Sequence, residues 1–147
     1  MAERIVVDAN LAVAVVLPLI YSEAATNQWQ TWQAGRAELY APVLWEYEVV
    51  SALRKAAATG LVSGQQAGGI LRQLFSLGVI CIPADAALHL AALDWSERLG
   101  QPVAYDGQYL ALAESLAAGF WTADRRLFEA LQGSDLPWLH WLGENAG

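Results

Sequence analysis

The feature that most constrains the fold of this chain is an alternation of short apolar runs with longer amphipathic segments. The apolar runs have the length of buried strands, while the segments between them repeat apolar residues at helical spacing and mostly end at glycine. Short strands that alternate with helices are typical of a parallel sheet covered by helices on both faces. No repeat or linker interrupts the pattern, so we predict one three-layer α/β/α domain over residues 1–147.

The pattern also predicts where the individual elements lie. The expected strands are residues 5–7, 38–42, 79–83, 120–124 and 137–142. The expected helices are residues 22–34, 43–60, 63–78, 84–100, a helix opening at Asp106, and 125–133. Ser22 and Asp106 are expected to cap their helices, because each precedes a helical run and carries a side-chain oxygen.

Length, charge and cysteine content exclude several classes of protein. The longest apolar run, residues 11–21, is too short to span a bilayer. The single cysteine, Cys81, excludes an internal disulfide and fits a reducing compartment, so we expect a cytoplasmic protein that does not enter a membrane. The formal net charge of −7 argues against a protein that coats nucleic acid through a broad basic surface, but it permits an enzyme with a local nucleic-acid site.

The hydrophobic content is high for a chain of this size. Hydrophobic residues make up 56% of the sequence, and seven residues are Trp. Either the core is large for the chain or some apolar surface is covered by a partner. We predict a symmetric homodimer, which is the commonest closed assembly.

Acidic residues stand where the predicted elements meet the carboxyl edge of the sheet, which is where functional groups collect in open parallel sheets. Asp8 follows the first strand and Asp124 ends the fourth, so both belong to that edge. Asp106 opens one helix, while Glu46 and Glu48 lie in the first turns of another. The topology therefore brings several carboxylates together. The alternative is that each acid only stabilises a helix N-terminus, as a cap or through the macrodipole.

Carboxylates that converge repel one another unless they hold protons or share a cation. A ligand set of oxygens without His or Cys suits a hard divalent ion such as Mg²⁺ or Mn²⁺. Such an ion activates water and stabilises the leaving oxygen of a phosphodiester. The acids therefore predict metal-assisted phosphodiester hydrolysis, although helical spacing alone does not choose between Glu46 and Glu48.

Four sequence blocks carry a resemblance to a known family. The blocks are VVDAN near the N-terminus, APVLWEYEVVSALRK, AYDGQYLALAE and WTADRRL. In this order they resemble the signature blocks of the PIN domain, most closely its VapC-type branch, the toxin ribonucleases of bacterial and archaeal toxin–antitoxin pairs. The resemblance implies a parallel sheet of about five strands and an endoribonuclease dependent on Mg²⁺ or Mn²⁺. It also implies single-stranded or structured RNA as substrate and a small cognate antitoxin as partner.

The resemblance assigns roles to individual residues. Glu48 is preferred to Glu46 because the family block places its Glu before Val and ahead of Ala-Leu-Arg, as in EVVSALR. Asn10 matches the small polar position after the first Asp, and Thr122 matches the hydroxyl two residues before the last. The acids that the match implies as metal ligands and catalytic groups are Asp8, Glu48, Asp106 and Asp124.

Basic and aromatic residues near the expected edge are candidates for RNA contacts. Arg125 and Arg126 follow Asp124 directly, and each either pairs with nearby acids or holds a substrate phosphate by a bidentate contact. Trp45 and Trp121 lie near the same edge and either stack on a base or pack in the core, which is the commoner role.

Two other functions compete with the nuclease. One is an inactive PIN-like module that works through a protein partner, but such a scaffold has no need to keep four mutually repelling acids. The other is a haloacid-dehalogenase-like phosphatase, which also begins with a strand ending in Asp. That chemistry requires a second Asp two residues further on, where this chain has Asn10. The sequence therefore favours the nuclease.

Overall fold

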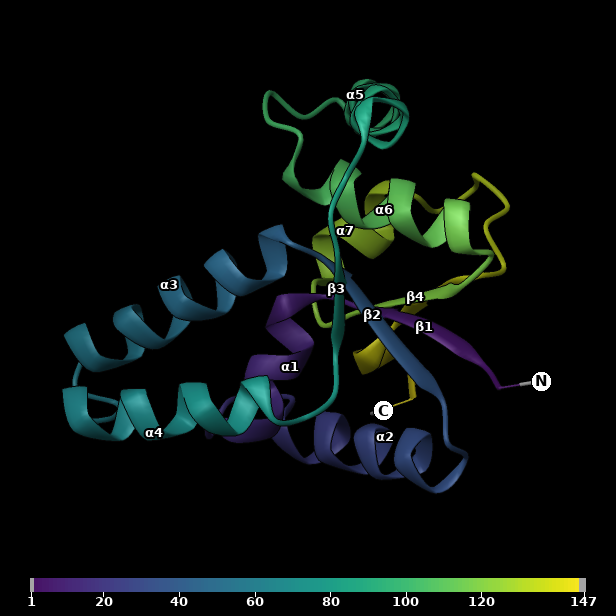
Figure 1. The fold of residues 1–147 in the computed structure, drawn as a ribbon. Coiled ribbons are helices and arrows are strands. Elements are labelled where there is room, and N and C mark those ends of the chain that lie inside the picture. Colours follow the sequence, from purple (N-terminus) through teal and green to yellow (C-terminus); the bar gives the residue numbers. More distant parts are fainter. Residues whose placement is uncertain (1, 146–147) are drawn as a thin grey trace.

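The computed structural model describes residues 2–145, in which helices flank a central sheet (Figure 1). The strands are β1 (Arg4–Val7), β2 (Glu38–Pro42), β3 (Ile80–Ile82), β4 (Gly119–Thr122) and β5 (Leu139–Trp141). The helices are α1 (Ala9–Val16), α2 (Ser22–Ala34), α3 (Leu44–Ala58), α4 (Gly64–Phe75), α5 (Ala86–Leu99), α6 (Tyr105–Leu116) and α7 (Arg125–Ala130), with a short 3₁₀ helix at Leu142–Asn145.

The five strands are all parallel and follow the order β3-β2-β1-β4-β5. β1 lies at the centre, where Ile5 pairs with Leu39 of β2 and with Gly119 of β4. α1 and α2 lie on one side of the sheet, and α6 lies on the other with α5 packed on its outer side (Figure 1). The predicted three-layer α/β/α fold is therefore confirmed.

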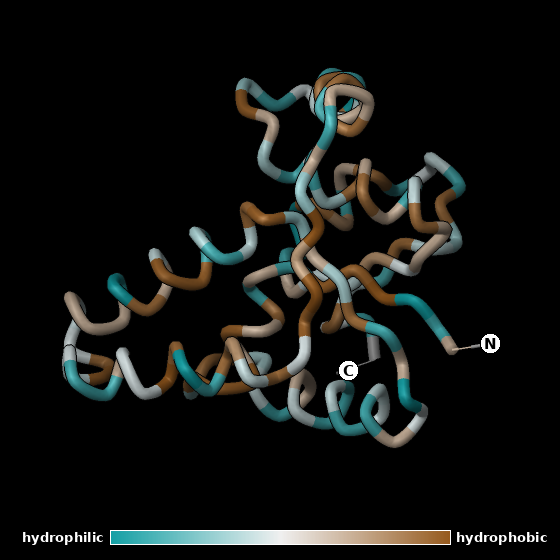
Figure 2. Tube along the Cα trace, viewed as in Figure 1, coloured by the Kyte–Doolittle hydropathy of each residue, from teal (hydrophilic) through white to brown (hydrophobic). Residues whose placement is uncertain are grey.

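One hydrophobic core joins the sheet to its helices. Hydrophobic residues recur along the central strands and on the adjoining turns of the helices, whereas α2 is largely hydrophilic (Figure 2). All seven Trp side chains are buried or partly buried, so the Trp content gives no separate reason to expect a partner surface. Within residues 2–145, no helix has both the length and the hydrophobicity needed to cross a membrane.

The sequence pattern predicts no element between Asp8 and Ser22, whereas the structure contains helix α1 there. Most of α1 is buried, including Leu11 and Val13. A helix that is apolar on every side lacks the periodic polar face by which a sequence reveals a helix, which explains the omission. The helix ends at Val16, and its C-cap residue Leu17 is extended because Pro18 follows it.

Two of the expected helix caps are wrong. Tyr21 takes the N-cap position of α2, and Ser22 is the first helical residue, whose hydroxyl donates to the carbonyl of Leu17. In α6 the N-cap position belongs to Ala104, and Asp106 lies inside the first turn. The Ser22 hydroxyl and the Asp106 carboxylate therefore form hydrogen bonds with residues that precede their helices.

Close packing of α5 on α6 depends on Gly107. A Cβ at this position would overlap the carbonyl oxygen of Ala92 and would lie 2.6 Å from Ser96 Oγ. We expect Gly107→Ala to lower the free energy of unfolding by about 1–3 kcal/mol, because the Ala92 backbone cannot yield without separating the helices. Gly68→Ala in α4 is the matched control, since nothing lies within 4 Å of its Cβ position.

Urea denaturation of both variants measures the difference. Gly68→Ala should raise the midpoint, because Ala is favoured over Gly within a helix by about 0.5–1 kcal/mol. A Gly107→Ala protein as stable as the wild type would show that the two helices are not held at this separation.

Candidate active site

The carboxyl ends of the central strands carry acids, as predicted. β1 ends at Val7, which pairs with Trp121 of β4. The ladder continues one residue further, because the Asp8 N–H donates to the carbonyl of Trp121 at 2.9 Å. Asp8 precedes α1, and Asp124 precedes α7 just beyond β4. Both acids therefore lie at the same edge of the sheet.

A hydrogen-bond network centred on the buried Thr122 holds Asp8 in place. The Thr122 hydroxyl donates to Asp8 Oδ2 at 2.9 Å and accepts from the Asp124 N–H at 2.9 Å. Asn10 Nδ2 lies 3.4 Å from both Asp8 Oδ2 and Thr122 Oγ1, while its Oδ1 accepts from the Ala123 N–H at 3.0 Å. Asp8 occupies the N-cap position of α1 but makes no side-chain capping bond, so the cap alternative is wrong for this residue.

The environment of Asp8 favours the protonated carboxyl group. Its pKa is raised to about 8, chiefly by burial, against the opposing hydrogen bond from Thr122. The negative charges of Glu48, Asp106 and Asp124 contribute to this rise. The acids therefore lie close enough to repel one another, and a cation among them would relieve that repulsion.

Glu48 projects from α3 and is oriented by a buried tyrosine. The Tyr109 hydroxyl donates to Glu48 Oε1 at 2.6 Å, and Tyr109 is only 1% exposed. Burial raises the pKa of Glu48, the bond from Tyr109 opposes this, and the charge of Asp106 adds to it. The sequence interpretation missed Tyr109. One signal was present, because Tyr109 lies about one turn after Asp106 and a buried tyrosine hydroxyl requires a partner.

Asp106 is held from the turn that precedes α6. Gln101 Nε2 donates to Asp106 Oδ2 at 2.7 Å. Burial raises the pKa of Asp106, the Gln101 bond opposes this, and the charge of Asp124 adds to it. Gln101 was also missed, because a single polar residue in a turn produces no periodic pattern.

Asp124 does act as a helix cap. Its Oδ1 accepts from the N–H groups of Arg126 and Leu127 at 2.9 and 3.3 Å. Its Oδ2 accepts no hydrogen bond from the part of the chain that the structure describes. The capping role therefore leaves one carboxylate oxygen for another ligand.

The two arginines after Asp124 differ in their surroundings. Arg125 Nε lies 2.7 Å from Glu129 Oε1, and its guanidinium lies 5.6 Å from the centre of the Trp141 ring. Of the two roles predicted for Arg125, the structure therefore shows the ion pair with a nearby acid, Glu129. Arg126 is exposed and forms no ion pair within residues 2–145, so its guanidinium remains available for a phosphate.

The structure separates the two candidate glutamates of α3. Glu46 is exposed and lies near β3, where burial first and then the charge of Glu46 raise the pKa of Cys81 to about 11. Glu48, by contrast, lies near enough to Asp8 to raise its pKa. The geometry therefore places Glu48 in the acidic cluster and Glu46 outside it.

The tryptophans considered for base stacking pack inside the protein. Trp45 is buried, and its ring centre lies 6.3 Å from that of Phe75. The Trp121 ring packs edge-on against Trp32 at 5.5 Å and stacks with His140 at 4.7 Å. Both residues therefore belong to the packing of the sheet.

The chemistry of the acidic cluster suits a hydrated hard cation. Within residues 2–145, no three His, Cys, Asp or Glu side chains form a ready-made cage around one ion. Mg²⁺ does not require such a cage, because it usually keeps several waters and takes only one or two carboxylates directly. The oxygen-only donor set and the mutual repulsion at Asp8 therefore fit Mg²⁺ or Mn²⁺ bound partly through water.

Comparisons with known proteins agree with the family resemblance of the sequence blocks. No protein-family model matches the sequence. The chain is 32% identical over 127 residues to Ribonuclease VapC3 of Pyrobaculum aerophilum, which covers 86% of this chain and 93% of the relative. The fold matches the crystal structure of PAE2754 from Pyrobaculum aerophilum with a TM-score of 0.67 and 26% identity, over 95% of this chain and 85% of the other.

A second solved structure shares the fold at low sequence identity. It is VapBC2 from Rickettsia felis bound to a DNA fragment from their promoter, with a TM-score of 0.64 and 12% identity. The match covers 95% of this chain and 99% of the other. At this identity the likeness concerns the fold alone.

Proposed function

Because the chain belongs to the VapC family of PIN-domain proteins, we propose that it is an endoribonuclease and the toxin of a toxin–antitoxin pair. Its reaction is the hydrolysis of RNA phosphodiester bonds. The observation that carries the proposal is the buried Asp8 carboxyl, fixed by Thr122 and surrounded by the charges of other acids. An inert scaffold has no reason to retain that repulsion.

We assign the binding of Mg²⁺ or Mn²⁺ to Asp8, Glu48, Asp106 and Asp124, directly or through water. A bound ion would supply the positive charge that activates water and stabilises the departing oxygen of the phosphodiester. The surrounding residues orient the acids. Thr122 and Asn10 fix Asp8, Tyr109 fixes Glu48, and Gln101 fixes Asp106. Arg126 offers a guanidinium to the substrate phosphate.

Cleavage of RNA by the purified protein tests this function. We expect end-labelled RNA to be cut in millimolar Mg²⁺ or Mn²⁺ but not in EDTA, and DNA of the same sequence to stay intact. Either ion alone should also raise the thermal midpoint, because a ligand that binds only the folded state stabilises it. The proposal would be contradicted if a mixed RNA pool were not cleaved and neither ion raised the thermal midpoint.

The proposal includes a small antitoxin and a homodimer, both in the cytoplasm, where the free thiol of Cys81 stays reduced. Leu90 and Leu93 of α5 are 62% and 61% exposed and lie one turn apart, so α5 offers apolar surface for a partner. Light scattering tests the dimer, and co-expression with the neighbouring reading frame tests the antitoxin. A monodisperse monomer at tens of micromolar that retains no small protein would contradict both.

A further inference from the structure

Helices α3 and α4 form a pair that extends beyond the sheet and carries an unusual charge for this chain (Figure 1). The sequence has no Asp or Glu between Glu48 and Asp85, although the whole chain has fifteen acids. The same stretch holds three of the eight basic residues, Arg54, Lys55 and Arg72. Beyond the first turns of α3, the helix pair is therefore locally positive in a chain whose formal net charge is −7.

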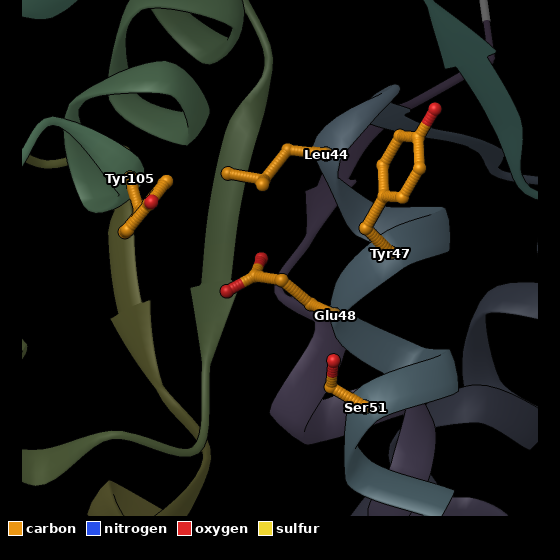
Figure 3. Close-up of a pocket in the computed structure, with 5 residues that line it drawn as sticks. All are labelled: Leu44, Tyr47, Glu48, Ser51 and Tyr105. Carbon is orange, nitrogen blue, oxygen red and sulfur yellow. The ribbon is translucent and has the colours of Figure 1, made fainter. Parts of the chain in front are cut away.

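Lys55, the single lysine of the chain, lies on the same face of α3 as Glu48. Seven residues are almost two helical turns, so Lys55 follows Glu48 about 10 Å further along the helix. Figure 3 shows Glu48 and Ser51 projecting from the same side of α3, whereas Tyr47 turns away. Lys55 is one turn beyond Ser51 on this side, is exposed, and forms no ion pair within residues 2–145. Its ammonium group is therefore free for a ligand that also reaches the acidic cluster.

Arg126 lies on the opposite side of Asp8 from Lys55. Helix α3 follows β2 and α7 follows β4, and these two strands flank β1, after which Asp8 comes. Arg126 stands in the first turn of α7, where it is exposed and has no acid within ion-pair distance among the described residues. A chain of negative groups that passes over Asp8 can therefore meet an unpaired cation on either side of it.

Other basic side chains lie elsewhere or are already in contact. Arg4 begins β1 and Arg36 precedes β2, so both belong to the amino edge of the sheet, opposite the acids. The Arg98 guanidinium lies 4.0 Å from the centre of the Trp95 ring. Arg125 is paired with Glu129. The positive charge near the acidic cluster is therefore confined to its two sides, at α7 and along α3.

We propose that the RNA backbone crosses the carboxyl edge of the sheet from α7 to α3, with Arg126 and Lys55 bound to phosphates on opposite sides of the bond that is cut. The inference rests on the proposed ribonuclease function and adds the course of the substrate to it. Phosphate contacts fix the register of a nucleic acid on a protein without reading its sequence. Two such contacts, one on each side, hold the phosphodiester between them over Asp8. The substrate must therefore carry phosphates both before and after the cut.

The salt dependence of binding counts the phosphate contacts without depending on cleavage. We measure fluorescence anisotropy of a short labelled single-stranded RNA at constant low Mg²⁺ with KCl varied, and every protein carries Asp8→Asn so that the RNA stays intact. Lys55→Gln should weaken binding about five-fold at about 0.1 M salt and reduce the slope of log K against log salt by about 0.7. Lys55→Arg should bind like the parent, because the charge is kept. Arg36→Gln is the matched control, since it removes an exposed charge at the opposite edge of the sheet.

Neutral methylphosphonate linkages locate the two contacts on the RNA. One such linkage on one side of the cut should weaken binding to the parent about five-fold but have no effect on the Lys55→Gln protein. A linkage on the other side of the cut should behave in the same way with Arg126→Gln.

The proposal is overturned if Lys55→Gln binds like the parent, or if both variants respond to linkages on the same side of the cut. It is also overturned if Lys55→Gln dissociates a dimer, which would assign this face of α3 to a second copy of the chain. A wild type that binds RNA through two separate linkages of this kind but cuts no RNA overturns the ribonuclease function instead.

Discussion

Asp8→Asn is expected to abolish RNA cleavage while making the metal-free protein more stable at pH 8. The substitution removes a carboxyl group that can ionise when a cation binds, and the cleavage rate should fall by at least about 100-fold. The amide keeps the size of the carboxyl group and still accepts the Thr122 hydrogen bond, so the fold should persist. A single-turnover assay in Mg²⁺ measures the first effect. Cleavage at the wild-type rate would remove Asp8 from the mechanism.

The gain in stability follows from the raised pKa of Asp8, which is about 8 in the folded protein against an ordinary value of 3.8. Between these values the folded state binds a proton that the unfolded state has lost. The contribution of Asp8 to the free energy of unfolding of the wild type is therefore complete below pH 3.8, and it is lost as the pH rises through about 8. In metal-free buffer the wild-type thermal midpoint should decline from about pH 5 to about pH 9, and the Asp8→Asn midpoint should decline less. Parallel curves for the two proteins would show that Asp8 is ionised throughout.

Glu48→Gln and Glu46→Gln form a matched pair on one helix with opposite expected results. Glu48 accepts the Tyr109 hydrogen bond within the acidic cluster, so Glu48→Gln should reduce cleavage by at least about 100-fold. Glu46 is exposed beside β3, and Glu46→Gln should cleave RNA at the wild-type rate. Thermal midpoints confirm that both variants are folded. An inactive Glu46→Gln protein beside an active Glu48→Gln protein would show that the wrong glutamate was assigned.

The position of the acidic edge could be predicted because it depends on topology more than on side-chain detail. Short apolar strands that alternate with helices indicate a parallel sheet. In a parallel sheet all strands end at the same edge, so Asp8 and Asp124, which follow two of the strands, lie at that edge. The choice of Glu48 over Glu46 required more, since both stand in the same part of α3. It came from a family resemblance, and the geometry agrees with it.

The contacts that orient the acids could not be predicted. Tyr109 and Glu48 are 61 residues apart, and their hydrogen bond depends on where the fold places α6 relative to α3. Asp106 was expected to cap its helix because Asp before a helical run usually does so. In the structure the N-cap position lies two residues earlier, at Ala104, and the Asp106 carboxylate accepts a hydrogen bond from Gln101. Local propensity indicates that a helix begins, but tertiary contacts determine which residue starts it.

The bond between Thr122 and Asp8 has a consequence for the synthesis of the protein. Its partners are 114 residues apart, and the strands that carry them pair side by side in the middle of the sheet. A chain emerging from the ribosome presents Asp8 first, but it cannot lock that carboxyl until β4 has also emerged. Pairing between such distant segments is slow, and it waits for the later strand. The acidic edge that we propose as the cleavage site therefore forms only after most of the message has been translated.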